Sequence, residues 1–240
     1  MTRRNLSPRR ATISRYELPG TSQYAREDGH ITWPFGLPFV SCYVYAPRAM
    51  GRDAEASRSL CIRVKSIDPL WLPHYARIVC QTSFRDRRVA RLFARDAVLV
   101  PVPGSSAAIA ARWAALQLAI ALSSMGSAQR VWTGLRREAA VRKSATAPEG
   151  ARPTVWQHYE SFAVMAPVMP MRRIVLIDDV VTRGRTLLAA AARLHHEMPQ
   201  ADIRAFALIR TLGFVERIEN VTQWCHGVIR WSGGDARREP

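Results

Sequence analysis

The sequence predicts an α/β fold in which helices flank a mainly parallel sheet. From residue 97 onward, short apolar runs with strand composition alternate with helix-periodic segments. One of these runs, 174–177, passes directly into two adjacent carboxylates and a glycine turn. Strands that alternate with helices form parallel sheets through right-handed crossovers. The 240 residues are enough for one domain of ordinary size with additions.

The first 84 residues are expected to form an arm and an accessory region. Residues 1–14 carry four arginines and no acid, which predicts a disordered basic arm. Residues 15–84 form the accessory region, in which 41–46 and 59–67 have strand composition and partial alternation that would allow them to pair. From 72 to 95 the apolar spacing becomes helical.

Residues 85–212 form the predicted core. Strands are expected at 97–103, 130–135, 161–168, 173–178 and 202–211, and helices at 107–123 and 186–198. The arginine-rich stretch 136–157 has no apolar period, which favours a mobile loop. Residues 213–240 are expected to be a C-terminal extension with a disordered tail.

The composition indicates which binding partners and which cellular location to expect. The chain carries 35 basic and 19 acidic residues, a net charge of +16, which favours an anionic substrate or nucleic acid. The four cysteines match neither a zinc pattern nor a compact disulfide framework, which favours free thiols in the cytoplasm. The most apolar helix candidate, 107–122, is too short and too polar to span a bilayer, so no membrane partner is expected.

The segment "IVLIDDVVTRGRT", residues 174–186, predicts a binding site. Ligands of open parallel sheets bind where strands end and helices begin. Gly184 permits a tight turn, and the backbone N–H groups at the following helix start suit a phosphate. Asp178 and Asp179 would repel that phosphate, so they require sugar hydroxyls or a magnesium ion as partners. Ribose 5-phosphate offers this combination.

The stretch "VLIDDVVTRGRT" resembles the PRPP-binding motif of type I phosphoribosyltransferases: an apolar run, two acids, two apolar residues and T-x-G-x-T. The "VPVP" strand end at 100–103 and the arginine-rich loop before the motif strand are similar to the ComF-type, amidophosphoribosyltransferase-like branch. The resemblance implies a type I phosphoribosyltransferase-like core with a variable N-terminal hood. It further implies an enzyme that uses Mg²⁺, moves the phosphoribosyl group of PRPP to a nitrogenous acceptor and releases pyrophosphate.

The resemblance also assigns roles by position. Asp178 and Asp179 would hold the ribose hydroxyls and act in catalysis together with Lys143, and magnesium would bind near them through the substrate. The ribose 5-phosphate would contact Asp178, Asp179, Val180, Thr182, Arg183, Gly184, Arg185 and Thr186. The pyrophosphate would contact Pro103, Gly104, Ser105, Arg137 and Arg142.

Several candidates keep two interpretations. His158 either assists a proton transfer or is a surface histidine, and Arg152 either closes over the site or is a solvated loop residue. Trp33, Phe35 and Trp71 either stack on a base or belong to the core. A nucleotide triphosphatase and a dinucleotide-binding fold are disfavoured, because no complete Walker A loop and no G-x-G-x-x-G is present.

The function itself keeps one alternative, a non-catalytic PRPP-sensing regulator or a ComF-type, DNA-uptake-associated protein that binds nucleic acid. A homodimer is compatible with either interpretation. The sequence leaves the acceptor open.

Overall fold

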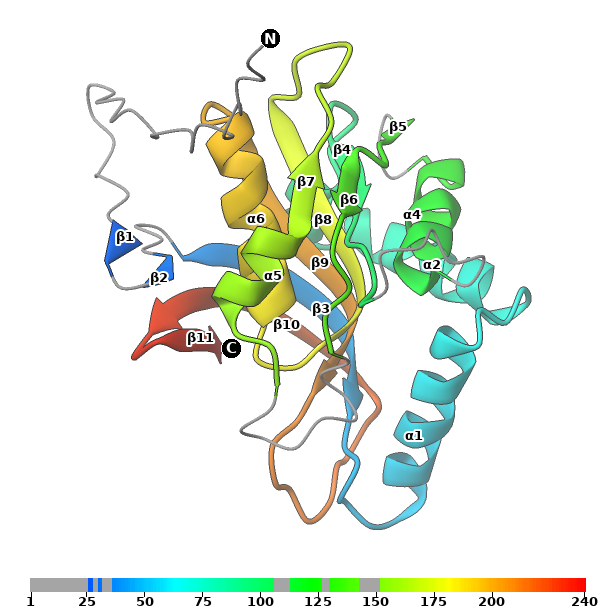
Figure 1. Ribbon diagram of the computed structural model, residues 1–240. Helices are drawn as coiled ribbons and strands as arrows, with labels where there is room; N and C mark the ends of the chain where they lie inside the picture. Colours follow the sequence, from blue (N-terminus) through cyan, green and yellow to red (C-terminus); the bar gives the residue numbers. More distant parts are fainter. Residues whose placement is uncertain (1–25, 28–29, 32–35, 106–112, 127–129, 143–151) are drawn as a thin grey trace, which may run out of the picture.

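The computed structural model describes residues 26–27, 30–31, 36–105, 113–126, 130–142 and 152–240. The basic arm expected at 1–14 lies outside the described residues. The α/β class is confirmed, with helices on both faces of a mostly parallel sheet (Figure 1).

Within the described residues, the central sheet has seven strands in the order β11, β10, β3, β9, β8, β4, β5. In chain order they are β3 (Leu37–Tyr45), β4 (Val98–Pro101), β5 (Arg130–Val131), β8 (Arg173–Val181), β9 (Asp202–Thr211), β10 (Thr222–Ser232) and β11 (Asp235–Glu239). The pairs from β3 through β9, β8 and β4 to β5 are parallel. Strands β10 and β11 extend the β3 edge in antiparallel fashion.

Two small antiparallel pairs lie outside this sheet. One joins β1 (Arg26–Glu27) to β2 (His30–Ile31), and the other joins β6 (Leu135–Arg137) to β7 (Phe162–Val164).

Helices cover the two faces of the sheet. One face carries α5 (Val155–Ser161) and α6 (Arg185–Glu197), and the other carries α1 (Arg52–Lys65), α2 (Trp71–Ser83), α3 (Arg87–Leu92) and α4 (Ala114–Ser124) (Figure 1). Strand β8 serves both cores, because its side chains alternate between faces. Ile174 and Leu176 pack in the cluster with α6, whereas Val175 and Ile177 pack in the cluster with α2 and α4. None of the described helices is long and apolar enough to cross a membrane.

The prediction of a strand at 59–67 is wrong, because these residues belong mainly to helix α1. The buried residues of α1 are Ala54, Ser57, Leu60, Cys61 and Val64. Their spacing of three and four residues is that of one helix face. Within 59–67 alone, apolar and polar residues alternate in part, as in a strand, so the helical spacing is visible only over the longer segment 54–64.

The strand expected at 161–168 is shorter and lies outside the central sheet. Residues up to Ser161 complete α5, and β7 pairs with β6 instead of joining the parallel strands. Phe162 and Leu135 are fully buried in the core cluster beneath α6. Residues 162–164 therefore add no strand to the central sheet. Strand β3, which comes from the expected accessory region, pairs with β9 in that sheet.

The disordered tail expected within 213–240 is also a wrong prediction, since β10 and β11 form a hairpin that reaches Glu239. Its two-residue turn consists of Gly233 and Gly234, both at positive φ, 57° and 82°. Two glycines at positive φ are what a tight hairpin turn requires.

Candidate functional site

The acid pair lies near the carboxyl end of β8, as the motif predicts. The four apolar residues before it are fully buried, and Asp178 pairs in register with Ala207 of β9. The strand does not end at the acids but continues to Val181. The backbone of both acids is therefore held within the strand, beside β9, and their spacing is set by it.

The two carboxyl groups interact strongly with each other. Burial raises the pKa of Asp178 well above its usual range, and the charge of Asp179 and a hydrogen bond between the two side chains raise it further. Asp178 Oδ1 accepts from the N–H of Asp179, and Asp179 Oδ1 accepts from the N–H of Val180, each at 2.9 Å. An acid pair of this kind gains free energy from any ligand that donates hydrogen bonds or carries positive charge.

Lys65, in the last turn of α1, supplies part of that compensation. Its Nζ lies 3.0 Å from Asp179 Oδ2, and its side chain is half exposed. Burial alone would lower the pKa of Lys65, but the charge of Asp179 and the hydrogen bond to it hold the pKa above its usual value. The sequence prediction missed Lys65, because its segment was expected to be a strand.

A turn, and not a continuous helix, follows β8. Thr182 and Arg183 are exposed, Gly184 has φ 89°, and α6 begins at Arg185. A Cβ atom on Gly184 would lie 2.7 Å from two carbon atoms of Ile229 on β10, so the position excludes a side chain in both conformation and space. The first N–H groups of α6 have no acceptor within the helix, which leaves them to a ligand or solvent.

Two arginines of this turn bind Asp235 on β11. Arg185 donates from Nε at 2.5 Å and from Nη2 at 2.6 Å, and Arg183 donates from Nη1 at 3.1 Å. Arg185 Nη1 also donates to the carbonyl of Pro153 at 3.2 Å. These contacts pin the turn to the C-terminal hairpin. The side chain of Arg185, a predicted 5-phosphate residue, is therefore engaged with Asp235 in this structure.

The turn after β4 lies beside the acid strand. The N–H of Val102 donates to the carbonyl of Ile177 at 2.9 Å, so the chain leaves β4 next to Asp178. The predicted pyrophosphate residues Pro103, Gly104 and Ser105 follow directly. The structure thus brings the two predicted loops together at one edge of the sheet.

Arg137 donates hydrogen bonds to the backbone of this turn. Its guanidinium donates to the carbonyls of Gly104 at 2.5 Å and Pro103 at 3.4 Å, and to Ser161 Oγ. Burial lowers the pKa of Arg137 to about 10, while the charge of Asp178 opposes that shift. Because the N–H of a trans peptide points opposite to its C=O, the N–H groups of Gly104 and Ser105 face away from Arg137. Arg137 therefore orients the predicted pyrophosphate turn and does not itself project into it.

His158 is a buried residue and not a surface histidine. Its Nδ1 lies 3.5 Å from Arg137 Nη2, and its Nε2 lies 3.5 Å from Thr186 Oγ1. Burial lowers its pKa to about 3, with further lowering by Arg137 and Arg185. The neutral imidazole thus links Thr186, in the first turn of α6, to Arg137 beside the turn at 103–105.

Of the remaining predicted site residues, the structure describes three and leaves three outside the described residues. Arg142 is exposed just beyond Val141, whose N–H donates to the carbonyl of Ser105 at 2.9 Å. Arg152 is partly buried and precedes α5. Trp71 stacks on Tyr75 in α2 and belongs to the edge of a core cluster. Lys143, Trp33 and Phe35 lie outside the described residues.

The donors at the acid pair suit a hard cation. Among the described residues, no group of three or more His, Cys, Asp or Glu side chains is placed to hold a metal ion alone. Two carboxylates are nevertheless the oxygen ligands that Mg²⁺ takes when substrate phosphates complete its coordination. The arrangement therefore fits magnesium bound jointly with a phosphorylated substrate.

Asp235, Lys65 and His158 are the site residues whose roles the sequence prediction missed. Each reaches the motif through a contact between distant parts of the chain, for which residue spacing gives no signal. No protein-family model matches the chain, and no curated protein matches it significantly.

Proposed function

We propose that the protein binds PRPP with Mg²⁺ and transfers its phosphoribosyl group to a nitrogenous acceptor, releasing pyrophosphate. One observation carries the proposal. The carboxylates of Asp178 and Asp179 stand near the end of β8, and a short turn separates them from Gly184, whose backbone is left-handed. Helix α6 begins directly after Gly184. This places hydrogen-bond acceptors for a sugar beside N–H donors for a phosphate.

The chain's own residues would act mainly by positioning. The turn at 182–184 and the start of α6 would hold the 5-phosphate, and the acid pair would orient the ribose hydroxyls. The negative charge of the pair would also favour the positive charge that develops at C1 as the C1–O bond to pyrophosphate breaks and the C1–N bond forms. The N–H groups of Gly104 and Ser105, turned outward by Arg137, would meet the departing pyrophosphate. Bound Mg²⁺ would neutralise charge on the diphosphate.

The ion pair between Lys65 and Asp179 also fits this function. A half-exposed ammonium at hydrogen-bond distance from the carboxylate occupies the place where a sugar hydroxyl would donate. Since the ammonium is half exposed and solvent weakens the attraction, the pair contributes little free energy and a substrate can displace it at small cost.

The first test is a calorimetric titration with PRPP and MgCl₂. We expect saturable binding to the wild type, and at least about tenfold weaker binding to D178N/D179N, a loss of about 1.4 kcal/mol or more. Asp53→Asn, an exposed acid in the first turn of α1, is the matched control and should bind as the wild type does. Equal affinity of the wild type and D178N/D179N would contradict the role given to the acid pair.

The second test measures pyrophosphate release from PRPP with a panel of nitrogenous bases and ammonia. Release that depends on one acceptor and is lost in D178N/D179N supports the transferase. Binding of PRPP without release in any case would instead support the alternative function, a PRPP-sensing protein.

A further inference from the structure

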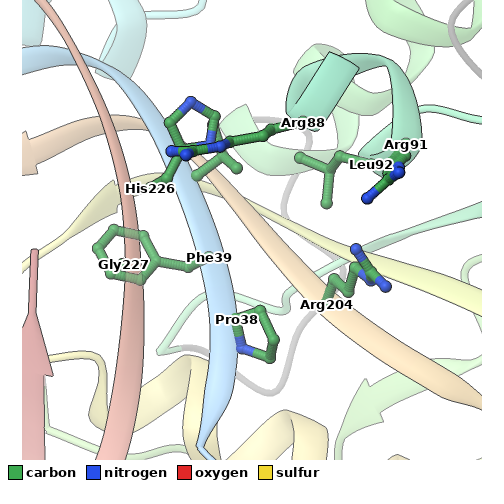
Figure 2. A pocket seen from close by; sticks show the side chains of 9 residues that line it. Pro38, Phe39, Arg88, Arg91, Leu92, Arg204, His226 and Gly227 are labelled. Atoms are coloured by element: carbon green, nitrogen blue, oxygen red, sulfur yellow. The ribbon is translucent and has the colours of Figure 1, made fainter. Parts of the chain in front are cut away.

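A separate group of positive charges surrounds a cavity at the other end of the parallel strands. The cavity has a volume of about 160 Å³ and lies between α3 and the starts of β3 and β9, with β10 at its side (Figure 2). Arg204 of β9 lies in register with Val175, whereas Ala207 lies in register with Asp178. Arg204 is therefore about 10 Å further toward the amino end of the strands than the acid pair.

Four cationic or ionisable side chains line this cavity: Arg88, Arg91, Arg204 and His226. In Figure 2 the guanidinium groups of Arg91 and Arg204 face each other, and Arg88 extends toward His226. Arg88 and Arg91 come from one face of α3, since they are three residues apart. The walls thus direct three guanidinium groups, from α3 and β9, and one imidazole, from β10, toward one space.

Only part of this charge is compensated by neighbouring acids. Arg204 pairs with Asp202 at 3.0 Å, and His226 Nε2 lies 3.3 Å from Asp86. Arg88 and Arg91 are exposed, and among the described residues no carboxylate or carbonyl accepts from either guanidinium. Two full positive charges therefore remain for a ligand.

The cavity is also well fixed. Asp86 accepts a 2.7 Å hydrogen bond from the N–H of Arg88 and so caps α3, while the same carboxylate contacts His226. Leu92 and Val40, buried to all but 2% and 7% of their surfaces, belong to the same core cluster and form its apolar floor. One carboxylate thus sets the position of both the helix that carries the arginines and the imidazole opposite.

We propose that this cavity binds the phosphate or diphosphate group of a small anionic ligand. Guanidinium groups bind phosphate oxygens in a bidentate manner, and converging arginines are a usual device for this purpose. The volume is about that of five water molecules and below that of pockets for drug-sized ligands. This favours a compact anion. Because the cavity and the acid pair lie at opposite ends of the strands, both sites can be filled at once.

The test uses a readout at the cavity itself. The imidazole resonances of the full chain are recorded by ¹H–¹³C NMR, and that of His226 is assigned by its loss in His226→Gln. Inorganic phosphate and pyrophosphate are then titrated at constant pH and ionic strength. We expect a saturable shift of the His226 resonance, and at least a tenfold higher half-saturating concentration in R88A/R91A.

The matched control is R87A/R95A, which removes two exposed arginines from the same region but none that line the cavity. It should titrate as the wild type does, within about twofold. No saturable shift in the wild type, or equal weakening in R87A/R95A, would overturn the proposal. The first result would show no site, and the second would show general attraction to a basic surface.

Two further arms separate this site from the alternatives. The D178N/D179N variant should keep the His226 shift, so that a failure of PRPP binding and a failure of this site are distinguishable. A single-stranded oligonucleotide is titrated in parallel. If it shifts His226 at low salt while phosphate and pyrophosphate do not, the surface is a nucleic-acid contact and the proposal is refuted.

Discussion

The Nζ atom of Lys65 lies 3.0 Å from Oδ2 of Asp179, which joins the last turn of α1 to β8 across 114 residues of chain. The same acid neighbours Asp178, whose charged form is disfavoured by burial and by the adjacent carboxylate. The candidate site is therefore built as a like-charge pair, with Lys65 in contact with Asp179 and the charge of Arg137 acting on Asp178. This relationship gives the first two predictions.

Replacing Lys65 with Met should destabilise the protein by about 0.5–1 kcal/mol at low ionic strength, because Asp179 loses its cationic partner. The loss should shrink in 1 M NaCl, since the pair is half exposed and salt screens it. Urea denaturation at the two salt concentrations measures both effects. Lys65→Arg keeps the charge and should stay close to the wild type; an equal loss in both variants would point to packing of the stem instead.

Replacing Asp178 with Asn should stabilise the unliganded protein while weakening PRPP binding. The folded state raises the pKa of this carboxyl, so the wild type loses stability as the pH rises from the ordinary carboxyl range through that raised value. The gain in D178N should therefore be small near pH 4 and reach about 1 kcal/mol or more at pH 8. Thermal denaturation across this range measures it. A variant that is less stable than the wild type at pH 8 would refute the prediction.

Gly184 should tolerate no side chain. Its φ of 89° disfavours any other residue, and a Cβ atom would approach Ile229 to 2.7 Å. Gly184→Ala should cost about 2–4 kcal/mol, the sum of backbone strain and overpacking. The G184A/I229A pair separates these contributions by a double-mutant cycle. Truncating Ile229 should recover the steric part, and a coupling energy of zero would show that no clash exists.

His158 should make the protein sensitive to mild acid. Its pKa is lowered to about 3 in the folded state, against about 6.5 for an exposed imidazole. The unfolded chain thus binds a proton below pH 6.5 that the folded chain does not, and stability falls as the pH decreases. From pH 6.5 to 5 this amounts to about 2 kcal/mol. Urea unfolding of His158→Gln should show a correspondingly smaller loss, whereas His196→Gln, an exposed histidine on α6, should keep the wild-type dependence.

The parts of the fold that sequence could predict are those in which local pattern and tertiary role agree. The run 174–177, the acids and the turn at Gly184 are contiguous, and each has a physical requirement that its residue type reveals. The strand, the turn and α6 are therefore where they were expected. The hairpin turn at Gly233 and Gly234 carried an equally local signal, and the prediction overlooked it.

The contacts that complete the candidate site have no such signal. Lys65, His158 and Asp235 come from three elements that the chain brings to β8 and α6 only when it folds. A lysine or histidine in a polar segment looks the same whether it faces solvent or a buried acid. Burial of Arg137, which the sequence placed in a mobile loop, was hidden for the same reason.

The Arg185–Asp235 contact should be the strongest ion pair that stabilises the candidate site. Burial alone would raise the pKa of Asp235, but hydrogen bonds from Arg185, the N–H of Ala236 and Arg183 hold it below its usual value. A lowered pKa means that the contribution is complete above the ordinary carboxyl pKa and is lost as the pH falls through the folded value. A double-mutant cycle of R185A and D235A at pH 7 should give a coupling of about 2 kcal/mol, which decreases toward pH 3.

The control cycle uses Arg230 and Glu239, an exposed pair on the same hairpin with a separation of 3.3 Å, and should give less than about 0.5 kcal/mol. Because Arg185 opens α6 directly after Gly184, Asp235→Ala should also weaken PRPP binding, although Asp235 is assigned no contact with the substrate. Coupling energies that are equal in the two cycles would show that the hairpin does not hold the turn in place.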